Sequence, residues 1–220
     1  MIAESYRHCE TLVRDADKDR FLSALFAPAE RRDALFALYA FHVEIARIPS
    51  VAPEPFAAAV RLQWWHEALS GERDGEAAAN PVAAALRDAL ASIGVDVAPL
   101  LEHLEAQRAI AFGEPETISD AAIFFTAARL IGAPGGGLGA AAASAGQAYA
   151  LAVRGRSPEL ARAHYEAFWA QLIELPQSAL PAFLPAALVP LLLRQPRAAQ
   201  WRKQVALLRA AWFGFAKLKY

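Results

Sequence analysis

Residues 17–50, DKDRFLSALFAPAERRDALFALYAFHVEIARIPS, contain the pattern that decides the fold. Within this stretch, apolar side chains recur at the i, i+4, i+7, i+11 and i+14 positions of one helix face, namely Ala34, Leu38, Phe41, Ile45 and Ile48. We predict a long amphipathic helix that begins after Pro28, with the Glu30 carboxylate near the positive end of the helix dipole. We expect the helix to end at Pro49, because proline lacks the backbone N–H that would continue it.

The segments on either side are also predicted to be helical. Residues 56–69 resume a helical pattern, and their adjacent Trp64 and Trp65 point in different directions, so we expect at most one of them to be fully buried. A short first helix is predicted over residues 5–15, with Ser5 as its N-cap. Further helices are predicted over residues 81–93, 98–112, 119–131, 138–153 and 201–220.

The composition is that of a folded, helical protein. The chain has 220 residues, of which 56% are hydrophobic and 20% are charged, and this length suits one substantial core. Alanine and leucine favour helix over strand, and the sequence has neither an internal repeat nor a convincing strand-like alternation. We therefore predict an all-α fold, a single domain over residues 1–220 built as one bundle of about eight to ten helices.

Two apolar stretches are considered as membrane spans. Residues 130–153 carry no charge, and residues 179–193 are apolar. Glycines and a proline break the first stretch near its beginning, and three prolines break the second. We expect a buried bundle helix over residues 138–153 and no membrane span over residues 179–193, because a membrane span needs about twenty uninterrupted apolar residues.

The single cysteine and the beginning of the chain bear on location. Cys9 has no second thiol with which to form an internal disulfide, and this suits a reducing cytoplasm. Residues 1–15 carry charge from the fourth residue onward and lack the apolar core of a signal peptide. We expect a cytoplasmic protein, with a position at the inner face of a membrane as the alternative.

The charge is unevenly distributed. No acidic residue follows Glu174, whereas seven basic residues do: Arg194, Arg197, Arg202, Lys203, Arg209, Lys217 and Lys219. A basic, aromatic C-terminal segment favours peripheral contact with an anionic membrane surface, and the alternative is a solvated helix face. We predict no nucleic-acid binding, because the pattern matches no nucleic-acid-binding module.

Several polar segments are similar to known sites without matching them. Asp15, Asp17 and Asp19 alternate with cations but lack the glycine and the closing glutamate of an EF-hand, so we expect a solvated loop. Residues 133–139, APGGGLG, lack the lysine and the preceding strand of a phosphate-binding loop and are predicted to form a helix–helix turn. Residues 114–120 are expected to form a polar turn that includes Asp120.

Three stretches resemble the squalene/phytoene synthase family of all-helical isoprenoid synthases. They are RFLSALFAPAERRDALFALYAF at 20–41, RLQWWHEAL at 61–69 and GQAYALAVRGR at 146–156. The resemblance implies the isoprenoid synthase fold. It also implies the family's chemistry, the joining of two prenyl diphosphates with the help of Mg²⁺ held by two aspartate clusters on facing helices.

The chain departs from the family at both aspartate clusters. By the resemblance, the first cluster falls on Ala46, Arg47 and Ser50, and the second falls near Ser157 and Ala161. None of these side chains is a carboxylate, so we predict no catalytic residue, no metal ligand and no cofactor. Mg²⁺ enters only if acids such as Glu102 and Glu105 form an atypical site, and a solvated face is the expected role of those two.

Residues 40–47, AFHVEIAR, resemble the branch of the family that includes mitochondrial complex I assembly factors. Glu44 matches the acid that this branch keeps in the central helix. The resemblance implies a non-catalytic scaffold that binds a protein partner in the assembly of a respiratory complex. Two alternatives stay open: a prenyl diphosphate transferase with an atypical metal site, and a binder of an isoprenoid or other lipid.

The candidate ligand-binding residues follow from the same resemblance. We expect an apolar pocket along one face of the central helix, with Arg47 and Arg156 binding an anion such as a phosphate or lipid head group at its mouth. The alternative for Glu44 and Arg47 is a helix-surface ion pair that contributes about 0.2–0.5 kcal/mol. The pocket-lining residues are Tyr39, Val43, Ala46 and Ser50.

Overall fold

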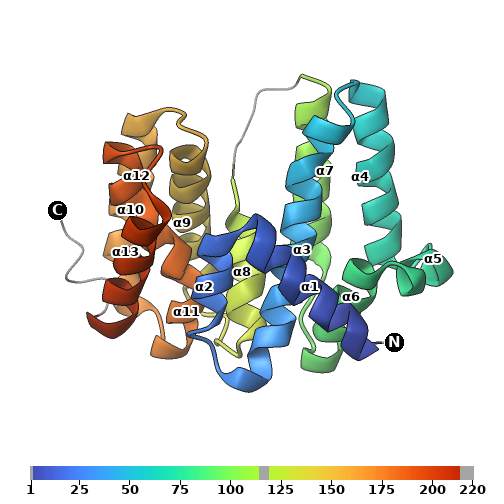
Figure 1. Ribbon diagram of the computed structural model, residues 1–220, viewed down its shortest axis with the longest axis horizontal. Helices are drawn as coiled ribbons and strands as arrows, with labels where there is room; N and C mark the ends of the chain where they lie inside the picture. The colour runs from blue at the N-terminus through green and yellow to red at the C-terminus, as the bar shows by residue number, and fades with distance from the viewer. Residues whose placement is uncertain (1, 114–118, 214–220) are drawn as a thin grey trace. The chain divides into compact units, whose positions relative to one another are not determined.

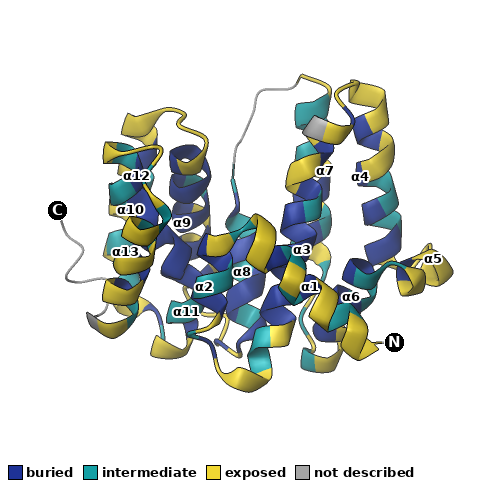
Figure 2. Ribbon diagram, viewed as in Figure 1, coloured by how far each residue is buried: buried dark blue, intermediate teal, exposed yellow. Residues whose placement is uncertain are grey.

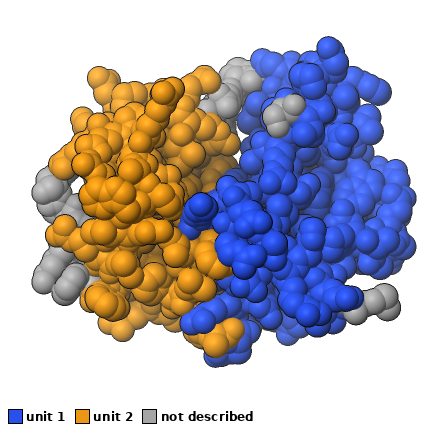
Figure 3. All heavy atoms as spheres, in the orientation of Figure 1, with its two compact units in different colours: residues 1–18, 30–117 blue, residues 19–29, 118–220 orange. Residues whose placement is uncertain are grey.

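The computed structural model describes residues 2–113 and 119–213, and every regular element within these ranges is helical (Figure 1). The predicted all-α class is therefore confirmed. The chain divides into two compact units, residues 1–18 with 30–117 and residues 19–29 with 118–220 (Figure 3). We call them unit 1 and unit 2. The single domain expected over residues 1–220 stays a prediction.

Unit 1 holds six helices among its described residues. They are α1 (Ile2–Ala16), α3 (Ala29–Val51), α4 (Pro55–Ser70), α5 (Asp74–Ala79), α6 (Pro81–Ile93) and α7 (Ala98–Ala111). In this unit α1 packs against α6, and α4 packs against α7. The Asn80 side chain caps α6 by accepting hydrogen bonds from the backbone N–H groups of Val82 and Ala83, both at 3.0 Å.

The central helix α3 carries the predicted buried face. Ala34, Leu38, Phe41, Ile45 and Ile48 are all buried, as their spacing requires. The predicted end of this helix is wrong, because α3 continues through Pro49 to Val51. The backbone N–H of Ala52 still donates to the carbonyl of Ile48 at 2.9 Å, since proline removes only its own donor from the last turn.

Unit 2 contains both long α-helices and short helical turns. Its described elements are α2 (Lys18–Ala24), α8 (Ala121–Leu130), α9 (Leu138–Val153), α10 (Pro158–Gln171), η1 (Leu172–Glu174), η2 (Gln177–Ala179), α11 (Leu180–Phe183), η3 (Leu184–Leu188), α12 (Val189–Arg194) and α13 (Gln200–Phe213). Helix α9 packs against α8, α10 and α12, and α13 packs against η3.

The uncharged stretch after residue 130 forms a buried helix, as predicted. Helix α9 spans the predicted Leu138–Val153, and Figure 2 shows it largely in the colour of buried residues. Its Gly146 lies directly against the first residues of α8, where a Cβ atom would overlap the backbone of Ala121. The backbone N–H of Asp120 donates to the Gly146 carbonyl at 3.3 Å, so the absence of a side chain at Gly146 allows α8 and α9 to meet.

The proline-rich stretch is a series of short helical turns. Within the described ranges, Gln177–Arg194 is the one segment that could cross a membrane by length and composition alone, and 56% of it is buried in the structure. It contains η2, α11, η3 and α12, which pack against α8, α9, α10 and α13. A core segment of a helical protein has the same composition.

Short helices account for the main differences from the prediction. The described residues form thirteen α-helices, more than the eight to ten predicted, because α2, α5, α11 and α12 have only four to seven residues each. Ser5 lies inside α1 and is not its N-cap. The Ser119 hydroxyl accepts a hydrogen bond from the Ala121 backbone at 3.1 Å, close to the predicted capping role.

Candidate functional site

One cleft in unit 1 brings two of the predicted site residues together. Glu44 and Arg47 from α3 line it with Arg61, Trp64 and Trp65 from α4, and its volume is about 570 Å³. The remaining lining residues are Ile48, Val51 and Asn80. The cleft combines two guanidinium groups with aromatic walls, a set that suits an anionic or planar ligand.

The two predicted charges form a surface ion pair. Arg47 Nη1 lies 3.6 Å from Glu44 Oε1, with 49% and 38% of the two side chains exposed. Water screens such a pair, so it contributes little to stability. Both groups are accessible from the cleft for a ligand or a partner.

Each of the two tryptophans of the cleft has a specific partner, an aromatic ring for Trp65 and a carboxylate for Trp64. Trp65 is buried and meets Phe41 edge to face at a centroid distance of 5.3 Å, while Trp64 is half-buried, as the adjacent pair predicted. Trp64 Nε1 donates to the Glu76 carboxylate of α5 at 2.8 Å. Arg73 donates to Glu67 and lowers the pKa of that carboxyl. The hydrogen bond from Trp64, and then the one from Arg73, lower the pKa of the Glu76 carboxyl.

The other predicted site residues lie in different environments. Tyr39 and Val43 are buried, and Ala46 is exposed. Ser50 lies in the last turn of α3, outside the residues whose side chains are described, and Arg156 belongs to unit 2, between α9 and α10. A single pocket that unites all seven residues stays a prediction.

A second cleft in unit 1 is almost entirely apolar. It has a volume of about 230 Å³ and lies beside the Pro49 end of α3. Its lining comes from α3, the following loop, α4 and α7: Ile45, Ile48, Pro49, Ala52, Pro53, Pro55, Ala58, Leu62, Gln107, Ile110 and Ala111. Such a lining suits a small apolar group better than a charged one.

Unit 2 contains a buried charge cluster that the sequence prediction missed. Asp19 and Arg20 were expected in a solvated loop, but both lie in α2 and are buried. Arg20 Nη2 donates to Asp120 Oδ2, and its guanidinium lies 5.0 Å from the centre of the Tyr149 ring. Asp120, expected in a polar turn, is buried as well. Buried charges require partners, and Arg20 and Asp120 are partners of each other in this fold.

The second acid of the cluster connects α2 to α13. Lys203 Nζ donates to Asp19 Oδ2 at 2.7 Å, and Gln200 Nε2 donates to Asp19 Oδ1 at 3.1 Å. In the sequence, the one feature that pointed to this cluster was the alternation of acidic and basic residues, DKDR, at 17–20. The sequence does not identify the partners of these charges.

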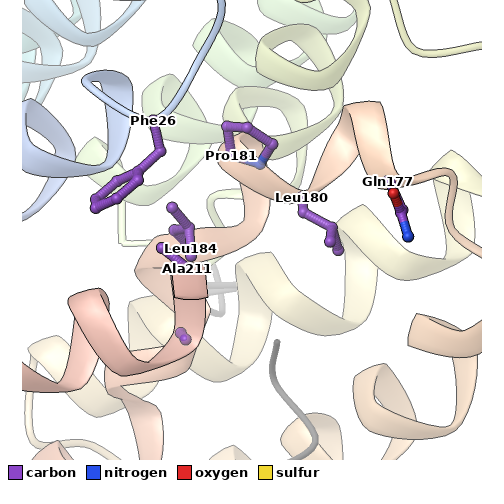
Figure 4. Close-up of a pocket in the computed structure, with 7 residues that line it drawn as sticks. Phe26, Gln177, Leu180, Pro181, Leu184 and Ala211 are labelled. Carbon is purple, nitrogen blue, oxygen red and sulfur yellow. The ribbon is translucent and has the colours of Figure 1, made fainter. Parts of the chain in front are cut away.

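An apolar groove in unit 2 lies between the α2–α3 connection and the C-terminal helices. Its volume is about 400 Å³, and Figure 4 shows Phe26, Pro181 and Leu184 close together, with Leu180 and Gln177 farther along it. Ala210 and Ala211 of α13 complete the lining. The lining carries no charged side chain, so hydrophobic contact would dominate binding there.

The described parts of the chain contain neither a cluster of metal-ligand side chains nor an accessible thiol. These parts contain no group of three or more His, Cys, Asp or Glu side chains that could hold a metal ion. Glu105, one of the acids considered for an atypical site, lies 3.9 Å from both His66 and Arg108. Burial raises the pKa of the Cys9 thiol to about 12, so Cys9 is protonated at neutral pH.

Comparison with known proteins identifies a family match and several curated relatives. Residues 13–120 match the family model described as squalene/phytoene synthase. The chain is 41% identical over 64 residues to a Drosophila melanogaster homolog of NADH dehydrogenase (ubiquinone) complex I assembly factor 6, covering 29% of this chain and 19% of that protein. It is 36% identical over 62 residues to assembly factor 6 of Homo sapiens, covering 28% and 19%. The match thus spans about a fifth of these relatives.

A solved structure shares the fold of the chain. The crystal structure of a dehydrosqualene synthase in complex with ligand aligns with a TM-score of 0.68 and 14% sequence identity. The alignment covers 96% of this chain and 97% of that chain. The isoprenoid synthase fold expected from the sequence is therefore confirmed.

Proposed function

Because this chain belongs to the squalene/phytoene synthase family, we propose that it is a non-catalytic member of that family, a scaffold that binds a protein partner during the assembly of a respiratory complex. The observation that carries the proposal is the identity of 34–41% to complex I assembly factor 6 from five animals. It concerns a stretch of 62–68 residues, so the assembly role is an extension from that stretch to the whole chain.

The residues at the family's metal positions support a non-catalytic role. A diphosphate leaving group needs divalent cations, which carboxylate oxygens hold. By the resemblance, the family's aspartates are expected at Ala46, Arg47 and Ser50 and near Ser157 and Ala161. The guanidinium of Arg47 would repel a divalent cation, so Mg²⁺-assisted departure of diphosphate has no support from these residues.

The unit 1 cleft is the surface that we assign to the protein partner. Its two arginines, together with half-buried Glu44 and Trp64, provide charged and aromatic groups on one concave surface. Tryptophan and arginine are the residues that contribute most to protein–protein binding energy. A partner with an acidic, partly apolar surface would complement this cleft.

Genetic deletion tests the assembly role. We expect a strain that lacks this protein to lose assembled respiratory complex I on a native gel, and the intact chain to restore it. The Arg47→Glu/Arg61→Glu variant should fail to restore the complex, because it reverses both positive charges of the cleft. The matched control is Arg162→Glu on α10, an exposed arginine outside the cleft. A normal level of assembled complex in the deletion strain would contradict the proposal.

Incubation with substrate tests the absence of catalysis. We expect no pyrophosphate release from farnesyl or geranylgeranyl diphosphate in the presence of Mg²⁺. Metal-dependent release that is lost on changing Glu102 or Glu105 would instead establish a prenyl diphosphate transferase with an atypical metal site.

A second candidate function is the binding of an isoprenoid or other lipid. The apolar cleft beside Pro49, with its volume of about 230 Å³, is the observation that favours it. This volume holds part of a prenyl chain rather than a whole lipid. Protection of Ile110 and Ala111 amides from hydrogen exchange on adding farnesol would support this function, and unchanged exchange would argue against it.

A further inference from the structure

The outward face of α13 is apolar where a surface helix is normally polar. Trp201, Val205, Leu208 and Trp212 follow an i, i+4, i+7, i+11 spacing and therefore form one stripe along the helix. Their exposed fractions are 60%, 45%, 44% and 77%. We call these four residues the α13 stripe.

The opposite face of the same helix is attached to unit 2. Leu207 and Ala210 are buried, and Lys203 pairs with Asp19 of α2 at 2.7 Å. Helix α13 packs against η3 on this side. The orientation of α13 is therefore set by its buried face, so the exposure of the stripe is a consequence of the fold and not of a loosely attached helix.

Basic groups border the stripe on one side. Arg202 and Arg209 lie seven residues apart, next to the stripe, and both are exposed. The Arg202 guanidinium lies 5.2 Å from the centre of the Trp201 ring and donates to Gln195 Oε1 at 2.6 Å. Within α13 no acidic residue offsets these charges, and the sequence has none after Glu174.

We propose that the α13 stripe docks this protein on the surface of an anionic phospholipid bilayer, with the two tryptophans at the level of the head groups. Two features favour a bilayer over a protein partner. Tryptophan, with its apolar ring and polar N–H, is enriched at membrane interfaces. The adjoining basic residues complement an extended negative surface without requiring individually placed acids. The proposal does not depend on the assembly role.

Vesicle sedimentation of the intact chain tests the proposal. We expect binding to phosphatidylcholine vesicles that contain 30% phosphatidylglycerol and little binding to pure phosphatidylcholine. Binding should fall in high salt, which screens the charges. The Arg202→Gln/Arg209→Gln variant should bind about 25-fold more weakly, since each basic residue near an anionic surface contributes roughly a fivefold gain. The Trp201→Gln/Trp212→Gln variant should lose at least about tenfold.

Matched controls separate docking from general effects. Phe56→Gln removes a 75% exposed aromatic ring from α4, and Arg162→Gln removes an exposed cation from α10. We expect both variants to bind vesicles like the unchanged chain. Brominated lipid should quench the fluorescence of the unchanged chain and not that of the Trp201→Gln/Trp212→Gln variant, whose fold is checked by circular dichroism.

Three results would overturn the proposal. The first is an unchanged chain that does not sediment with anionic vesicles. The second is binding that the stripe and arginine variants leave unchanged. The third is a dimer that the Trp201→Gln/Trp212→Gln variant converts to monomer without any vesicle binding, because the stripe would then be a contact between copies of the chain.

Discussion

The guanidinium of Arg20 and the carboxylate of Asp120 form a buried ion pair in unit 2, although 100 residues separate them in the sequence. Their side chains are only 4% and 5% exposed. The pair joins α2 to the residue that precedes α8, and the Tyr149 ring of α9 lies against the same guanidinium. Three parts of unit 2 therefore meet at one charge pair.

Removal of one partner should destabilise the protein strongly. We expect Arg20→Met to lower the free energy of unfolding by about 3–5 kcal/mol, because Asp120 would remain buried with its principal cation removed. Urea denaturation followed by circular dichroism measures this loss. The double variant Arg20→Met/Asp120→Leu should recover most of the stability, and a double variant as unstable as the single one would show that the charge itself is not the cause.

Gly146 should not tolerate a side chain. We expect Gly146→Ala to lower the stability by about 1–3 kcal/mol, because the new Cβ would overlap the Ala121 backbone and push α8 away from α9. Gly139 in the same helix is the matched control, since a Cβ there meets nothing within 4 Å. Gly139→Ala should raise the stability by about 0.4–1 kcal/mol. Equal effects of the two substitutions in thermal unfolding would contradict the close approach.

The thiol of Cys9 should be unreactive in the folded protein. Its side chain is fully buried, and burial raises its pKa from 9.0 to about 12, so no thiolate forms at pH 8. We expect a thiol reagent at pH 8 to label Cys9 only as fast as the protein opens, and rapidly in denaturant. Because the pKa of Cys9 is higher in the folded than in the unfolded chain, the unfolded chain loses the thiol proton first as the pH rises. The contribution of Cys9 to the stability is therefore fully present below pH 9 and is lost progressively toward pH 12. Rapid labelling of the native protein would rule out this environment.

Asn80 should stabilise the start of α6 through its side-chain oxygen. We expect Asn80→Ala to cost about 1 kcal/mol, because Val82 and Ala83 lose the acceptor for their backbone N–H groups. Asn80→Asp keeps an acceptor at the same position and should retain most of the stability. Urea denaturation of the two variants distinguishes capping from the other contacts of Asn80, and similar losses in both would exclude the capping role.

Several helices could be predicted closely from the sequence because their signals are local. Helix α6 begins and ends at the predicted residues, since Asn80 with Pro81 and then Gly94 give conventional start and stop signals. Helix α9 also has its predicted bounds. The apolar periodicity of α3 identified its buried face, but the local rule for Pro49 misplaced its end by two residues.

The candidate site was predictable only in part. Glu44 and Arg47 lie three residues apart in the same helix, and the helical repeat places residues at this spacing next to each other. Arg61 and Asn80 join them in the cleft from other elements, and nothing in the order of residues pairs those elements with α3. Likewise, the exposure of Trp201 and Trp212 depends on which face of α13 its neighbours cover.

The sequence by itself determined the all-α class and the bounds of its strongly patterned helices, and it predicts side chains other than carboxylates at the positions where the family is expected to hold its metal. Only the tertiary structure decided that Asp19, Arg20 and Asp120 are buried charges, that Gly146 is a contact point, and that α13 turns an apolar stripe outward. The reason is physical: a helix forms from interactions within a few residues, whereas burial of a charge depends on partners that folding brings from distant parts of the chain.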